Sequence, residues 1–89
     1  MKETTTTTLT EAVNLMLDRV RAVLDGRDIE VEHETDGRWL ADAVKLPGAM
    51  AYGATEAEAI RRCQWLAYEM ARDICGPGYV ESPDGDEPE

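Results

Sequence analysis

Apolar residues recur with two different periods along the chain, and these periods divide it into helices and strands. Between residues 9 and 25 they recur every three or four positions, the period of an amphipathic α-helix: Val13, Met16, Leu17, Val20, Val23 and Leu24. Thr8 and Glu11 have the spacing of a capping box, and Gly26 is typical of the position after a helix. We predict a helix over residues 9–25, preceded by a disordered polar tail over residues 1–8.

A period of two follows, which predicts a β-hairpin with strands at residues 28–34 and 38–45. A two-residue loop would place Trp39 on the same face as the glutamates of the first strand. A three-residue loop, ending at Gly37, places Trp39 with Ile29 instead. Because a shift of one residue turns every side chain to the other face, the pattern selects the three-residue loop, with Gly37 in the left-handed conformation.

The opposite face of this hairpin combines acidic and apolar side chains: Glu30, Glu32, Glu34, Leu40, Asp42 and Val44. Apolar residues among charges of one sign are typical of a surface that contacts another protein. A merely solvated strand face would have the same pattern. The sequence leaves both interpretations open.

The stretch Leu46-Pro47-Gly48 predicts a turn, because Pro presets φ and Gly adopts conformations that other residues avoid. Residues 49–52 then predict a short third strand, and Gly53 allows a sharp bend after it. Thr55 and Glu58 form a second capping box. The sheet should therefore be followed at once by a helix.

That helix should cover residues 55–75 and end at Gly76-Pro77-Gly78. Its core-facing positions have helical spacing: Ala59, Ile60, Cys63, Leu66, Ala67, Met70 and Ile74. Residues 79–80 could form a brief fourth strand, and the acidic residues 81–89 predict a disordered tail.

A second stripe lies beside the core stripe of this helix: Arg61, Trp65, Tyr68 and Arg72. Large aromatic residues flanked by arginines are typical of interface anchors, and a symmetric dimer would bury two copies of them. Alternatively, Trp65 and Tyr68 pack against the first helix and complete the core. We keep self-association and core packing as competing hypotheses.

The chain has 89 residues, enough for one small domain, and domains of this size often gain stability by forming homodimers or larger homo-oligomers. Its 19 acidic and 9 basic residues give a net charge of −10, which argues against direct binding to nucleic acid or to an anionic membrane. A basic protein partner suits this charge better. Short apolar runs and the absence of a signal-peptide pattern predict a cytoplasmic protein.

Little in the sequence indicates catalysis or a cofactor. Cys63 and Cys75 would lie about 18 Å apart on one helix, too far for a disulfide, and His33 is the single histidine. The hairpin acids form a linear row, which a solvated strand face explains better than a metal cluster does. We expect no enzyme activity, no metal and no cofactor.

Taken together, several of these features resemble the HicB-like antitoxin family. The resemblance spans roughly residues 28 to 75 and is carried by Asp36-Gly37, Trp39, Leu46-Pro47-Gly48, Gly53-Ala54-Thr55 and Glu58-Ala59. It implies a partial RNase-H-like α+β fold of the order α-β-β-β-α(-β), with a three-stranded antiparallel sheet and helices packed on it. It also implies a partner, HicA, which is a small basic ribonuclease toxin whose active site the antitoxin masks.

Many members of that family carry a second, DNA-binding domain. After Gly78 only eleven residues remain in this sequence, so we expect a single-domain member that does not repress its own operon directly. Two other functions stay open: an oligomeric adaptor of the same fold without a toxin, and an acidic mimic of nucleic acid that inhibits another nuclease.

Overall fold

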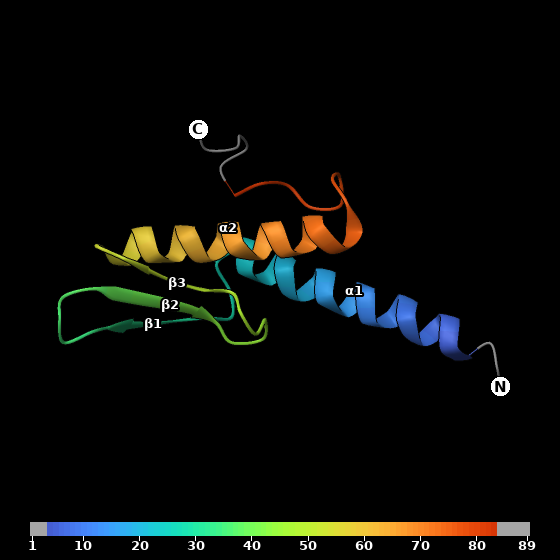
Figure 1. Ribbon diagram of the computed structural model, residues 1–89, viewed down its shortest axis with the longest axis horizontal. Coiled ribbons are helices and arrows are strands. Elements are labelled where there is room, and N and C mark those ends of the chain that lie inside the picture. The colour runs from blue at the N-terminus through green and yellow to red at the C-terminus, as the bar shows by residue number, and fades with distance from the viewer. Residues whose placement is uncertain (1–3, 84–89) are drawn as a thin grey trace.

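The computed structural model describes residues 4–83, which form two helices and three strands. In chain order these are α1 (Thr4–Leu24), β1 (Ile29–His33), β2 (Trp39–Ala43), β3 (Met50–Gly53) and α2 (Glu56–Cys75). The strands form one open antiparallel sheet in the order β1-β2-β3, which confirms the predicted α+β class. In Figure 1, α2 lies along one face of the sheet, and α1 runs from beneath the middle of α2 away from the sheet.

The β1–β2 hairpin has the predicted register. Val31 lies opposite Ala41, so both belong to the face that α2 covers. The N–H of Glu34 donates to the carbonyl of Arg38 at 2.7 Å, which leaves three residues in the loop. The last of them, Gly37, has φ +96°, in the left-handed region that favours glycine. Strand β1 is two residues shorter than predicted and β2 is three residues shorter, whereas β3 has the predicted length but lies one residue later.

A tight turn joins β2 to β3, as Leu46-Pro47-Gly48 predicted. The N–H of Leu46 donates to the carbonyl of Ala43 at 2.9 Å, and the N–H of Ala49 donates back to Leu46 at 3.0 Å. Gly48 has φ +96°, so this turn also uses the left-handed conformation. The two hydrogen bonds set the register of β3 against β2.

Small side chains form the contact between α2 and the sheet. The residues of α2 that are fully buried are Ala59, Cys63, Ala67 and Ala71, and they meet Ala41 and Ala43 of β2. Small residues at this interface let the helix approach the strands closely. A Cβ at Gly53 would lie 2.5 Å from the backbone nitrogen of Ala59, so only glycine fits at this corner.

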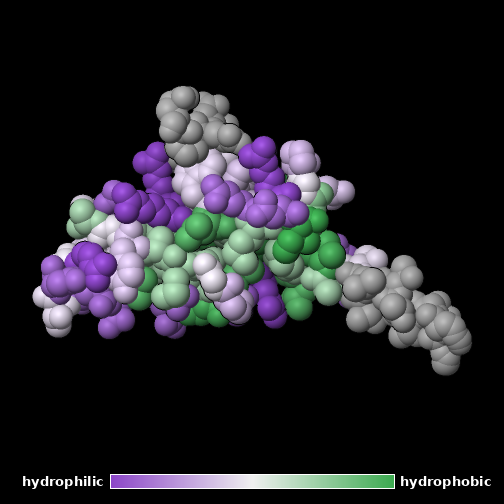
Figure 2. All heavy atoms as spheres, in the orientation of Figure 1, coloured by the Kyte–Doolittle hydropathy of each residue, from purple (hydrophilic) through white to green (hydrophobic). Residues whose placement is uncertain are grey.

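Helix α1 contributes four buried residues, Leu17, Val20, Ala22 and Val23, all from its C-terminal half. The side chain of Gln64 on α2 ties the end of α1 in place, because its Nε2 donates to the carbonyl of Val23 at 3.0 Å. Hydrophobic side chains gather on the face shown in Figure 2 where the two helices meet. Residues 10–15 of α1 are exposed, and Met16 packs partly against this core.

The predicted capping box forms in part at the start of α2. Thr55 Oγ1 accepts a hydrogen bond from the N–H of Glu58 at 3.1 Å. Glu58 Oε1 in turn accepts from the N–H of Ala54 at 2.7 Å. Two backbone amides at the strand-to-helix corner therefore have side-chain partners, although the second belongs to Ala54 and not to the N-cap residue Thr55.

The prediction that residues 1–8 form a disordered tail is wrong for residues 4–8, because α1 begins at Thr4. Thr8 and Glu11 consequently lie inside the helix and do not start it. Threonine is a modest helix former, but adding turns to an existing helix costs far less than nucleating one. Residues 1–3 lie outside the described residues.

Two predictions at the end of α2 are also wrong. Ile74 is 61% exposed, because the buried residues of α2 are spaced by four and lead to Cys75 instead. Residues 79–80 form no strand. The carbonyl of Tyr79 accepts a hydrogen bond from Arg21 of α1, so this segment lies beside a helix and away from the sheet. Residues 81–83 form no helix or strand, and the rest of the predicted tail, 84–89, lies outside the described residues.

Candidate functional site

Among residues 4–83, no helix covers one face of the sheet. Odd-numbered residues of β2, such as Ala41 and Ala43, are buried under α2, so even-numbered residues of the strands point the other way. We call this side the outer face. Its side chains are Glu30, Glu32, Glu34, Arg38, Leu40, Asp42, Val44, Met50 and Tyr52. All six residues predicted for the partner-binding face are among them.

Acidic side chains gather at the β1 side of the outer face. Glu30 lies opposite Asp42, and Glu32 lies opposite Leu40. Together they line a shallow hollow of about 250 Å³. Within the part of the chain that the structure describes, none of these carboxylates makes an ion pair. The hollow therefore suits a Lys or Arg side chain, whose apolar stem can lie on Leu40 while its charge meets the carboxylates.

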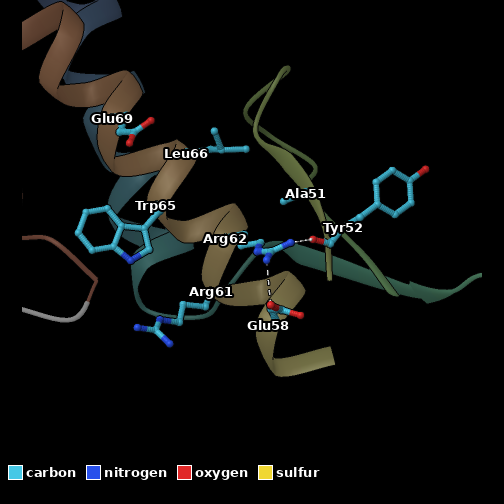
Figure 3. Close-up of a pocket in the computed structure, with 8 residues that line it drawn as sticks. All are labelled: Ala51, Tyr52, Glu58, Arg61, Arg62, Trp65, Leu66 and Glu69. Atoms are coloured by element: carbon cyan, nitrogen blue, oxygen red, sulfur yellow. Dashed lines mark hydrogen bonds and ion pairs between the residues drawn. The ribbon is translucent and has the colours of Figure 1, made fainter. Parts of the chain in front are cut away.

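Apolar side chains gather at the β3 side of the outer face. Val44, Met50 and Tyr52 are each between 41% and 45% exposed, and Tyr52 lies opposite Leu40 in the register. Figure 3 shows the Tyr52 ring pointing away from α2. Met50 and Tyr52 are outer-face residues that the sequence pattern did not indicate. Alternation along β3 could have identified them once the register of β3 was known.

The hairpin loop holds a basic side chain over this apolar patch. Arg38 donates to Asp36 from its backbone nitrogen at 3.1 Å and from Nε at 2.9 Å. The backbone hydrogen bond, aided by the nearby guanidinium, lowers the pKa of Asp36. The Arg38 guanidinium lies 4.1 Å from the centre of the Tyr52 ring, a cation–π distance. The outer face thus has a defined basic corner at the hairpin end.

The predicted self-association stripe lies on α2 instead. Trp65 and Tyr68 are half-buried and contact each other edge to face, with ring centres 5.4 Å apart. Neither ring is among the side chains packed against the core of the described residues. Arg61 and Arg72 are exposed at the two ends of the stripe. The core-packing hypothesis required the aromatic pair to complete the core. Among the described residues, the pair instead lies outside it.

A groove of about 650 Å³ separates α2 from the free edge of β3 (Figure 3). Arg62 crosses it: Nη1 donates to the carbonyl of Tyr52 at 3.0 Å, while Nη2 pairs with Glu58 Oε2 at 2.9 Å. Trp65 and Leu66 form the helix side of the groove. Sequence reasoning missed this contact, although the i, i+4 spacing of Glu58 and Arg62 was a signal for the ion pair.

His33 and Cys63, whose side chains could take part in catalysis, are each held by contacts within the fold. His33 stacks on Trp39 with ring centres 4.2 Å apart. Cys63 is fully buried, and its Sγ donates to the carbonyl of Ala49 at 3.3 Å. Burial raises the pKa of this thiol, which keeps it protonated and unreactive. Among residues 4–83, His, Cys, Asp and Glu side chains form no group of three suited to a metal ion.

Neither described helix has the length and apolar character needed to cross a membrane. No protein-family model, curated protein or solved structure matches the chain. The fold, the outer face and the sequence motifs are therefore the observations that bear on function.

Proposed function

We propose that this protein is a HicB-like antitoxin module, which binds a small basic ribonuclease toxin of the HicA type and masks it. The observation that carries the proposal is the outer face of the sheet. It is uncovered among the described residues, and it joins carboxylates that lack ion pairs to an exposed apolar patch. A surface with both properties suits a protein partner better than solvent alone.

The two parts of the outer face have different roles in this proposal. A ribonuclease must present positive charge to hold RNA phosphates. The acidic side, with Glu30 and Glu32, complements such a surface and speeds encounter with it. The apolar side, with Met50 and Tyr52, supplies buried area that holds the complex together. Masking is then a steric block that needs no catalytic residue.

The proposed family membership also implies a fold type, the partial RNase-H-like fold. The observed order of one helix, three antiparallel strands and a second helix across one face supports the partial RNase-H-like arrangement that the family resemblance implies. The proposal places the protein in the cytoplasm, where an RNA-cleaving partner would act.

The first test is an affinity pull-down of the tagged protein from its native host. We expect a small basic protein in stoichiometric amount that cleaves RNA alone and loses this activity when the antitoxin is added. Recovery of only further copies of this chain would contradict the proposal and favour an oligomeric adaptor. Recovery of an unrelated nuclease would favour a nucleic-acid mimic.

Charge-matched variants locate the binding face. Changing Glu30, Glu32 and Glu34 together to Gln should weaken toxin binding at least tenfold. A control that removes the same charge elsewhere combines Glu11→Gln, Glu56→Gln and Asp73→Asn, all exposed and on the helices. Equal losses in the two triple variants would mean that net charge matters and the outer face does not.

A further inference from the structure

The hydrogen-bond pattern of the hairpin shows which N–H and C=O groups of β1 face β2 and which face away from the sheet. The N–H of Glu34 donates to Arg38, and the N–H of Val44 donates to the carbonyl of Asp28. Hydrogen-bonded pairs alternate with non-bonded pairs in an antiparallel ladder. The even-numbered residues of β1 therefore make the bonds to β2.

The odd-numbered residues, Ile29, Val31 and His33, consequently direct their N–H and C=O groups off the sheet. Strand β1 is at the edge of the sheet, and no segment among residues 4–83 pairs with its free side. The opposite edge differs, because Arg62 already donates to the carbonyl of Tyr52 on β3. Among the described residues, the sheet thus has one edge that no strand pairs with and one where a side chain occupies the carbonyl of Tyr52.

The side chains beside the open edge define the strand that would fit it. Glu30 and Glu32 are exposed on the outer face, while Ile29 and Val31 are half-buried on the face toward α2. A strand added to an edge places its side chains directly opposite those of the edge strand. A second copy of β1 would therefore bring glutamates against glutamates, which is unfavourable.

We propose that the β1 edge accepts an extended segment of a protein partner in which Lys or Arg alternates with apolar residues. The basic side chains would face Glu30 and Glu32, and the apolar ones would cover Ile29 and Val31. Main-chain hydrogen bonds would pair with the outward groups of the edge, as in other cases of strand addition. This inference rests on the proposed function, because it specifies how the acidic outer face engages a basic partner.

Amide hydrogen exchange on the unmodified protein tests the inference directly. The probe is a synthetic seven-residue peptide of alternating Lys and Val, blocked at both ends. We expect it to slow exchange at least tenfold at the amides of Val31 and His33, which point outward. The amide of Glu32 already bonds to β2 and should change much less. Unchanged exchange at Val31 and His33 with the peptide at saturating concentration would overturn the proposal.

A peptide of the same composition but a different residue order provides the control for simple charge attraction. A peptide with the same four Lys and three Val residues, but with the two types in separate blocks, keeps the net charge and loses the alternation. It should bind at least tenfold more weakly than the alternating peptide. Equal affinity would mean that the glutamates attract any basic chain and that no strand is added.

A proline variant tests the main-chain contacts. Val31→Pro removes an outward N–H while leaving the ladder to β2 intact, and proline is tolerated on edge strands. It should reduce affinity for the alternating peptide at least tenfold, whereas Val31→Ala should stay within threefold. Far-ultraviolet circular dichroism and urea unfolding establish that both variants fold. Equal affinities of folded Val31→Pro and the wild type would contradict the proposal.

The same variants separate this inference from the proposed function. If the outer-face glutamate variants lose the ribonuclease toxin but Val31→Pro keeps it, the antitoxin function stands and strand addition is wrong. If no toxin exists, the peptide experiments still decide whether the edge accepts a basic strand.

Discussion

Gly53 is the residue at which side-chain size matters most for the fold. A Cβ there would lie 2.5 Å from the nitrogen of Ala59 and 3.0 Å from its Cα, so backbone would have to move. We predict that Gly53→Ala lowers the free energy of unfolding by about 3 kcal/mol, at the upper end of overpacking effects. Urea unfolding measures this loss.

The control for this variant is Ala54→Ser, at the next, exposed position. It should change the free energy of unfolding by less than about 0.5 kcal/mol. If Gly53→Ala were as stable as Ala54→Ser, the close approach of α2 to β3 would not exist in solution.

Cys63 should make stability depend on pH in the alkaline range. Burial raises the pKa of its thiol in the folded state, whereas an unfolded thiol ionises near pH 8.5. The unfolded state therefore releases its proton first, and the neutral thiol's contribution to stability is complete below about pH 8.5 and falls as the pH rises. Relative to Cys63→Ala, the reduced protein should keep its stability up to about pH 8.5 and lose stability between about pH 8.5 and pH 10.

Urea unfolding of the two proteins at several pH values gives this difference. Cys75 serves as an internal comparison, because it is half-buried and should react with a thiol reagent well before Cys63 does. A constant stability difference across the pH range would show that Cys63 is exposed to water in solution.

At the scale of elements, the start of α2 depends on one hydroxyl group. Thr55 Oγ1 accepts the N–H of Glu58, and loss of such a cap typically costs about 1 kcal/mol. We predict that Thr55→Ala lowers the free energy of unfolding by about this amount, while Thr55→Ser keeps it within about 0.5 kcal/mol. Thermal or urea unfolding of both variants provides the test. Equal losses would assign the effect to the methyl group instead of the hydroxyl.

The elements also show where sequence reasoning succeeds. The hairpin register could be predicted because a one-residue error would expose Ile29 and Val31 together. The cap of α2 could be predicted because Thr55 and Glu58 are only three positions apart in the sequence. The position of Tyr52 on the outer face could not be predicted, because it depends on how the turn at Leu46 sets the register of β3 against β2. The hydrogen bond from Arg62 to the carbonyl of Tyr52, which we call the Arg62 bridge, depends on the rotamer that the arginine adopts. No local sequence pattern determines that rotamer.

For the whole molecule, the sequence hypothesis of self-association remains a prediction. Trp65 and Tyr68 form an aromatic pair on α2 apart from the outer face of the sheet. If two copies meet there, sedimentation equilibrium should give twice the monomer mass. The double variant Trp65→Ala and Tyr68→Ala should then give a monomer with the same circular dichroism.

Two variants serve as the comparison in that experiment. Met50→Ala and Tyr52→Ala remove apolar area from the outer face and should leave the dimer intact. A monomeric wild type would contradict self-association, and a dimer sensitive only to the outer-face variants would place the interface on the sheet.

The Arg62 bridge has a consequence for assembly. In polymer terms, a sheet with two open edges is a bifunctional unit, which can add strands on both sides and grow without limit. Arg62 occupies the carbonyl of Tyr52, so this protein is closer to a monofunctional unit. Such a unit ends a growing sheet when it joins one. This chain and one basic partner strand would thus form a pair of fixed size that resists fibre formation.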